Sequence, residues 1–202
     1  MARPPRFDSD QLLDAAVRLA AASGPGAVTM SAVASEVQAP SGSVYYRFPG
    51  RNALLAEVWL RTIERFQEGY LAALGSEAPS TSAAARQAAR AAARHVVAWS
   101  RANPQEAALL LYCPEDFGRA DWSEEHRHRA DFDNHRVYTA LAALASTLGA
   151  DGPQDADRVT LALIDLPLSL VRRHLRADAP LPPHAEQLAE DCSDALLGPL
   201  PA

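Results

Sequence analysis

The chain has 202 residues, of which 48% are hydrophobic, and a formal net charge of −6 at pH 7. Ala is abundant and β-branched runs are scarce, so this composition predicts an all-α protein with a sizeable core. No run of about 18 apolar residues could span a bilayer, and no leading apolar stretch resembles a signal peptide. Two cysteines do not make a disulfide framework. We therefore expect a cytoplasmic protein with no membrane partner.

The charge is distributed unevenly along the chain. Every basic residue is Arg, and residues 1–55 hold five Arg against four acidic residues, a balance of +1. The remaining residues hold 14 Arg against 21 acidic residues, a balance of −7. Only the charge near a nucleic acid acts on its phosphates, so the overall negative charge does not exclude DNA binding by the first part.

The first fifty residues predict three short helices. The first should span residues 8–24, with a capping side chain at its start and Gly24 at its end. Thr29 offers a capping hydroxyl to the second helix. A turn at residues 38–40 should lead into the third helix over residues 41–47, because Pro suits a helix start.

Beyond residue 50, apolar residues at spacings of three and four predict further helices. The segment 113–121 contains Pro, Gly and three acidic residues and is predicted to be a loop. The predicted helices are residues 51–74, 81–101, 105–112, 123–148, 155–176 and 184–197.

The segment from Thr29 to Phe48 is the most informative part of the sequence. It predicts two short helices joined by a tight turn, the second with small residues at its start and two adjacent tyrosines. Small residues would let its backbone approach a DNA duplex. Adjacent tyrosines point about 100° apart, so one can reach a phosphate while the other packs on a base edge.

Flanking arginines can pair with phosphates. Val44 and Phe48, four residues apart, should anchor the helix to its own domain. The alternative interpretation of the segment is a helical hairpin with a polar surface. Including Arg6 of the basic N-terminal arm, the predicted DNA-contacting residues are Arg6, Thr29, Ser41, Gly42, Ser43, Tyr45, Tyr46, Arg47 and Arg51.

This combination resembles the N-terminal domain of TetR-family transcriptional regulators over the first 55 residues. The chain departs from the family pattern at Gln38-Ala39-Pro40, where Gly-Val-Ser is usual, and at Ala20, where an aromatic residue is common. The similarity is carried by LLDAAVRL at residues 12–19 with Gly24, by Thr29 with Val33-Ala34, and by GSVYYRF at residues 42–48 followed by Arg51 and Leu54-Leu55.

The resemblance implies an all-α homodimer of about nine helices. Residues 1–50 would form a three-helix helix-turn-helix DNA-binding domain, and residues 51–202 a helical ligand-binding and dimerisation domain. By position, Thr29 matches the family's capping residue that often touches a phosphate. Family DNA-contact positions match Ser41, Gly42, Ser43, Tyr45, Tyr46 and Arg51.

The expected function is that of a ligand-responsive transcriptional regulator, a repressor by analogy with the family. A dimer would place two recognition helices one DNA turn apart, about 34–36 Å, on a near-palindromic double-stranded operator. A small apolar effector would release the DNA through its different affinity for two states of the protein. The alternative is a helical small-molecule-binding or protein-interaction protein without DNA binding.

Aromatic residues on several helices of the second part can line an apolar ligand cavity, although the alternative is that most belong to the core. Asp165 lies in an apolar stretch and would need a partner, either Ser169 or a ligand. Pro167 should leave the carbonyl of Leu163 without its helical donor. The predicted ligand-binding residues are Trp59, Ile63, Phe66, Trp99, Tyr112, Phe117, Phe132, His135, Tyr138, Asp165 and Leu166.

The last two long helices are predicted to form the dimer interface. Residues 159–175 are apolar on more sides than one core face requires, and a symmetric four-helix packing would cover the surplus. The alternative is burial within one chain.

Metal binding and catalysis are not expected. His128, Asp131 and His135 share a predicted helix face, but their charged neighbourhood indicates a solvated surface rather than a metal site. No strained Gly-x-Ser-x-Gly turn and no phosphate loop with Lys is present, so we expect no enzyme and no cofactor. Cys113 is expected to be a buried thiol.

Overall fold

The computed structural model describes residues 8–75, 77–150 and 152–198, which form helices and no strand, and the predicted all-α fold is confirmed. These residues pack into two compact units. Unit 1 holds the described residues up to 63 together with 108–130, and unit 2 holds residues 64–107 and those from 131 onward. The predicted functional division at residue 50 is a different boundary and stays a prediction.

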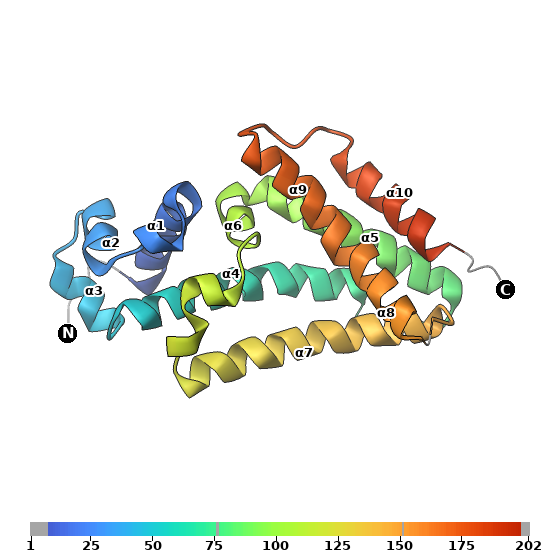
Figure 1. Ribbon diagram of the computed structural model, residues 1–202, viewed down its shortest axis with the longest axis horizontal. Coiled ribbons are helices and arrows are strands. Elements are labelled where there is room, and N and C mark those ends of the chain that lie inside the picture. Colours follow the sequence, from blue (N-terminus) through green and yellow to red (C-terminus); the bar gives the residue numbers. More distant parts are fainter. Residues whose placement is uncertain (1–7, 76, 151, 199–202) are drawn as a thin grey trace, which may run out of the picture. The chain divides into compact units, whose positions relative to one another are not determined.

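Unit 1 begins with three short helices, α1 (Ser9–Ser23), α2 (Met30–Glu36) and α3 (Ser41–Arg47) (Figure 1). Their starts follow from local capping, as the sequence predicts. The Asp8 carboxylate accepts a hydrogen bond from the Gln11 N–H at 2.8 Å, and the Thr29 hydroxyl accepts one from the Ala32 N–H at 3.1 Å. The longer α4 (Arg51–Leu74) follows and contributes to unit 1 as far as residue 63.

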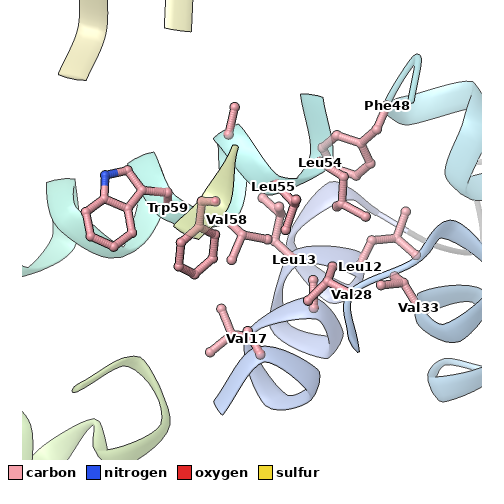
Figure 2. Packing of buried hydrophobic residues seen from close by; sticks show 14 of the residues in the cluster. Leu12, Leu13, Val17, Val28, Val33, Phe48, Leu54, Leu55, Val58 and Trp59 are labelled. Carbon is pink, nitrogen blue, oxygen red and sulfur yellow. The ribbon is translucent and has the colours of Figure 1, made fainter. Parts of the chain in front are cut away.

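One apolar core holds these helices together. Leu12 on α1, Val33 on α2 and Val44 on α3 are fully buried against Leu54 on α4. Figure 2 shows leucine and valine side chains of the first helices directed toward Leu55 and the other apolar residues of α4. Each such side chain contributes about 1.5–3 kcal/mol when it leaves water, so this packing determines where α3 lies in unit 1.

Ion pairs add to the attachment of α1. Arg18 Nε lies 3.0 Å from Glu36 Oε1 on α2, and Arg61 Nη2 lies 2.7 Å from Asp14 Oδ1. Since these carboxylates are well exposed, each pair contributes about 0–1 kcal/mol, which is less than the burial of one leucine. The apolar core therefore dominates the stability of the three-helix arrangement.

The sequence predicts a loop at residues 113–121, and the structure shows two 3₁₀ turns there, Pro114–Phe117 and Arg119–Asp121. Phe117 and Trp122 are buried, and Trp122 Nε1 donates a hydrogen bond to the Phe117 carbonyl at 2.9 Å. This burial is a long-range effect that the Pro, Gly and acidic residues of the segment do not reveal. The neighbouring helices are α6 (Pro104–Leu109) and α7 (Glu124–Thr147).

Unit 2 is built on α5 (Ser82–Ala102) and α10 (Ala185–Leu197), which lie side by side in Figure 1. The buried residues of α5 that pack in this unit include four alanines, whose small side chains allow close helix packing. Arg101 makes two hydrogen bonds to Glu186, at 2.8 and 2.7 Å, and these lower the pKa of the Glu186 carboxyl. This bidentate pair fixes the start of α10 to the end of α5.

The predicted helix at 155–176 is observed over residues 153–176, but its middle is irregular. It consists of α8 (Pro153–Thr160), a π-helical turn (Leu161–Asp165) and α9 (Leu166–Arg176). With these three pieces counted as one helix, the described residues contain nine α-helices. None of the described helices combines the length and the apolarity needed to cross a membrane.

The π-helical turn coincides with the predicted effect of Pro167. The proline cannot donate a hydrogen bond to the Leu163 carbonyl, and the buried Tyr70 hydroxyl donates to that oxygen instead, at 3.3 Å. Burial raises the pKa of Tyr70, so its hydroxyl keeps the proton that it donates. A side chain of α4 thereby compensates for the irregularity in a distant part of the sequence.

Close packing next to Tyr70 involves Gly69 and His95. His95 Nε2 donates a hydrogen bond to the Phe66 carbonyl at 3.1 Å, and its ring lies against Gly69. A Cβ atom at residue 69 would clash with His95 Cε1, so only glycine fits this position while the imidazole is in place. Burial lowers the pKa of His95, which favours the neutral imidazole.

We predict that Tyr70→Phe will lower the free energy of unfolding by about 1–3 kcal/mol, because the buried Leu163 carbonyl loses its donor. Urea denaturation followed by circular dichroism measures this change. The matched control is Tyr138→Phe, which removes the same hydroxyl from a side chain that is 61% exposed and should change stability by less than about 0.5 kcal/mol. Equal stability of the two variants would contradict the assigned role of the Tyr70 hydroxyl.

Candidate nucleic-acid interface

Helix α3 presents one apolar and one polar face. Val44 is completely buried and Phe48, directly after the helix, is 6% exposed, which confirms the predicted anchoring role of this pair. On the other side, Tyr45 is 57% and Tyr46 84% exposed. Among the large hydrophobic side chains of the described part of unit 1, these two adjacent tyrosines are the most exposed, so this surface is the best candidate for a binding site there.

The first turn of α3 is also accessible. Ser41 and Gly42 are exposed, and nothing lies within 4 Å of the position that a Cβ atom of Gly42 would occupy. The first turn therefore carries no bulky side chain that would keep another molecule away from the backbone. This is the property that a helix needs in order to approach the bases in a DNA groove.

The turn before α3 is well formed despite its unusual sequence. The Ala39 N–H donates to the Ala34 carbonyl at 2.8 Å and the Gln38 N–H donates to the Ser35 carbonyl at 3.1 Å, the pattern of a Schellman motif. Gln38 has a φ of 55°, the left-handed conformation in which glycine is favoured. The chain accepts the strain of about 1–2 kcal/mol because buried residues on both helices hold the turn.

Arg47 and Arg51 lie beside α3 in different ways. The Arg47 guanidinium carbon is 5.8 Å from the centre of the Tyr46 ring, a cation–π arrangement on the exposed face. Arg51 instead donates hydrogen bonds to two backbone carbonyls, to Val28 at 2.8 Å and to Pro25 at 3.0 Å. Arg51 therefore has a structural contact in unit 1, in addition to its predicted contact with a phosphate.

Thr29, like Arg51, has structural contacts in addition to its predicted contact with a phosphate. Its hydroxyl caps α2 and also lies 3.2 Å from the Ser31 hydroxyl. The side chain is half-buried. Among the other predicted DNA-contacting residues, Ser43 is half-buried on α3, and Arg6 lies outside the described residues.

Several residues predicted to bind a ligand belong to unit 1. Trp59 is 7% exposed and its ring lies 5.1 Å from that of the fully buried Phe117, while Ile63 packs against the same core. The ring of Tyr112 meets Phe117 edge-on at 6.1 Å. Trp59, Ile63 and Phe117 therefore belong to the core of unit 1, in agreement with the alternative interpretation that the sequence left open, whereas Tyr112 is exposed beside them.

In unit 2 the structure separates the remaining predicted ligand residues. Phe66 and Trp99 pack edge to face at 5.3 Å, beside Tyr70 and His95. Other members of the predicted set do not point into this apolar cluster, because they are exposed: Phe132, His135, Tyr138, Asp165 and Leu166. The aromatic composition of α7 does not indicate which face of that helix is covered.

Three polar residues that the sequence did not single out connect neighbouring elements within each unit. Glu57 Oε1 lies 3.0 Å from His126 Nε2 and 2.8 Å from Arg129 Nη1 within unit 1, and His95 and Tyr70 connect elements of unit 2. Pro167 indicated that the Leu163 carbonyl needs another donor, but the sequence did not identify Tyr70 as that donor. Nothing in the local sequence of Glu57 indicates its partners.

The expectation of a buried Cys113 is wrong. This thiol is exposed, and its Sγ atom donates to Asp116 Oδ2 at 3.1 Å. The hydrogen bond to Asp116 raises the pKa of Cys113 and so favours the less reactive thiol form. The residue is exposed because the 3₁₀ turn that begins at Pro114 buries Phe117 instead.

Comparison with known proteins agrees with this architecture. Residues 12–58 match the family model described as bacterial regulatory proteins, tetR family. No curated protein matches the chain. Similar solved structures do exist, and at identities of 14–21% their likeness concerns the fold.

The fatty acid degradation regulator FadR from Bacillus halodurans superimposes with a TM-score of 0.68 at 16% identity, over 99% of this chain and 98% of its own. The transcriptional regulator FadR from Bacillus subtilis, solved in complex with stearoyl-CoA, has a TM-score of 0.69 at 14% identity, over 96% and 100%. PfmR from Thermus thermophilus, a TetR-family transcriptional regulator, has a TM-score of 0.64 at 21% identity, over 98% and 100%.

The described residues thus combine a helix-turn-helix whose second helix is exposed with a second, helical unit. Residues 12–58 match the model of the TetR family of bacterial regulatory proteins, and the whole chain has the fold of a solved TetR-family regulator. The family resemblance seen in the sequence is confirmed.

Arg51→Met should lower the free energy of unfolding by about 1 kcal/mol, because the Val28 and Pro25 carbonyls lose a charged donor in a partly exposed setting. Chemical denaturation monitored by tryptophan fluorescence measures the loss. Arg47→Met is the matched control and should leave stability within about 0.5 kcal/mol, since Arg47 lies over an exposed ring. If Arg51→Met were as stable as Arg47→Met, the two carbonyl contacts would have no structural role.

Proposed function

We propose that this protein is a ligand-responsive transcriptional regulator, and specifically a repressor, that binds a near-palindromic DNA operator as a homodimer. The observation that carries the proposal is the exposed face of α3, where Tyr45 and Tyr46 point into solvent from a helix anchored by Val44 and Phe48. A helix held rigidly on one side and bare on the other suits insertion into the major groove.

The residues of this face divide into two roles. Tyr45 and Ser41 donate hydroxyl hydrogen bonds to phosphates, which position the protein without reading sequence. Tyr46, the more exposed of the two tyrosines, packs on base edges, and Arg47 lies against its ring. The proposed contact surface with the DNA backbone is completed by Thr29, Gly42, Ser43, Arg51 and Arg6 of the N-terminal arm.

Dimerisation is supported by apolar side chains that unit 2 leaves exposed. Leu161 and Leu166, at either end of the π-helical turn, are 41% and 36% exposed, and Leu188 on α10 is 42% exposed. Burying such side chains in a symmetric interface gains free energy in proportion to the apolar area removed from water. We place the interface on α8, α9 and α10.

Two observations support regulation by a small molecule: a ligand is bound in a structurally similar protein, and one helix of this chain belongs to both units. The Bacillus subtilis FadR structure contains stearoyl-CoA. In this chain α4 belongs to unit 1 up to Ile63 and to unit 2 from Glu64. A ligand that prefers one arrangement of the unit 2 helices can therefore change DNA affinity through α4, by the difference in its affinity for the two states.

DNA binding is tested by fluorescence anisotropy with the region upstream of the protein's own gene and with sites selected from random DNA. Tyr45→Phe should weaken binding about fivefold on every site, since one phosphate hydrogen bond of about 1 kcal/mol is lost. Tyr46→Ala should reduce discrimination between the selected site and a mismatched site about tenfold. Tyr138→Phe, the control in unit 2, should bind as the wild type does.

Unchanged binding by both α3 variants would remove the assigned roles of the tyrosines. If the wild-type protein selected no DNA site while still binding small molecules, the alternative function of a helical ligand-binding protein would be favoured.

Leu188→Glu should shift the protein from dimer to monomer at micromolar concentration, because a charge would be buried in the proposed interface. Sedimentation equilibrium measures the change. The matched control is Gln87→Glu on α5, which adds the same charge at an exposed position outside the proposed interface and should leave the dimer intact. A wild-type protein that is monomeric under these conditions would exclude the proposed dimer.

A further inference from the structure

Besides a groove of about 900 Å³ between α4 and α7, unit 2 contains a smaller pocket of about 170 Å³. Its walls come from α5, α8, the residues directly after α7 and the last turn of α10, all within unit 2. Sites for drug-sized ligands measure about 300–1,000 Å³, so this pocket suits a smaller molecule.

One part of the pocket is apolar. Val159 and Leu197 are 1% and 7% exposed and belong to the core of unit 2, so they form its inner wall. Leu148 and Leu196 are half-buried and continue this wall toward solvent. A small apolar group placed against these four side chains gains free energy in proportion to the area that it removes from water.

Two arginines bring positive charge to the same pocket. Arg86 of α5 is exposed, and the side chain of Arg158 on α8 is 40% exposed. Arg158 Nη1 lies 3.9 Å from Asp155 Oδ1, too far for a hydrogen bond, while Asp155 Oδ2 accepts from the Gly152 N–H at 3.3 Å. Within the described residues neither guanidinium makes a hydrogen bond, and the lining carries two positive charges against one carboxylate.

Arg86 differs from the arginines that follow it on α5. Arg90 and Arg94 come four and eight residues later, so the three side chains lie along one face of the helix. Arg90 Nη2 and Arg94 Nη1 lie 3.3 and 3.0 Å from carboxylate oxygens of Glu190 on α10. Among the described lining of the pocket beside Arg86, the end of α10 provides Leu197 and its neighbours but no carboxylate. An external anion at Arg86 would therefore continue a row of charge pairs that the described chain leaves open.

We propose that this pocket binds a small organic acid with a compact apolar body, its carboxylate between Arg86 and Arg158 and its body against Val159 and Leu196. A guanidinium presents a planar fork of donors that matches a carboxylate. A cavity of about 150 Å³ can hold benzene, so a single ring suits the volume. The inference goes beyond the proposed regulator function, because the pocket belongs to unit 2 and binding to it needs no DNA.

The experiment compares benzoate with benzamide, which has nearly the same shape without the charge, and with acetate, which has the charge without the ring. NMR titration of the full chain, with the arginine side-chain Nε–H signals observed, gives both the affinity and the site. Benzoate should shift the signals of Arg86 and Arg158. It should bind at least about tenfold more tightly than benzamide and about fivefold more tightly than acetate.

Arg86→Gln and Arg158→Gln should each weaken benzoate about three- to fivefold, and Arg86→Glu by more than about tenfold. Arg176→Gln, which removes an exposed guanidinium at the end of α9 in the same unit, is the matched control and should bind as the wild type does. Equal affinity for benzoate and benzamide, or benzoate affinity that is unchanged in both glutamine variants, would overturn the inference and leave Arg86 and Arg158 as solvated side chains. Acetate binding as tightly as benzoate would remove the apolar part of the site.

Discussion

The structure depends on the burial of the apolar face of α4. Near its start, Leu54, Leu55 and Val58 complete the core that orients the three short helices, and near its end Tyr70 and Leu74 enter the core of unit 2. The ion pairs that join α1 to α2 and α4 contribute less free energy to folding than this burial, because their carboxylates are well exposed. The position of every DNA-facing side chain in unit 1 follows from that packing.

Strain in the helix-turn-helix is tolerated for the same reason. Gln38 occupies a left-handed conformation that costs about 1–2 kcal/mol for a residue with a side chain. The Schellman hydrogen bonds and the buried Val33 and Val44 on either side of the turn keep it in place. A departure from the usual family sequence therefore leaves the local geometry intact.

Local signals made much of the fold predictable from the sequence. The starts of α1 and α2 follow from the capping side chains of Asp8 and Thr29, and the end of α1 from Gly24. The anchoring of α3 by Val44 and Phe48 follows from their spacing. These features depend on residues a few positions apart, which a single sequence displays.

The parts that could not be predicted depend on contacts distant in sequence. Aromatic residues look alike whether they are core, as Phe117 is, or exposed, as Phe132 is. Pro167 indicated a free carbonyl, but the donor, Tyr70, is 93 residues away from the Leu163 that it contacts. The groove between α4 and α7 of unit 2 is lined by His135 of the predicted ligand-binding set, but its carboxylates and alanines give no local signal of a site.

The contact between Gly69 and His95 has an evolutionary consequence. Because the imidazole occupies the space of a missing Cβ atom, neither residue can change alone without steric conflict or an unfilled void. In homologous chains, a larger residue at the first position should accompany a smaller one at the second. Covariation of these two positions would then record how the contact between α4 and α5 is maintained.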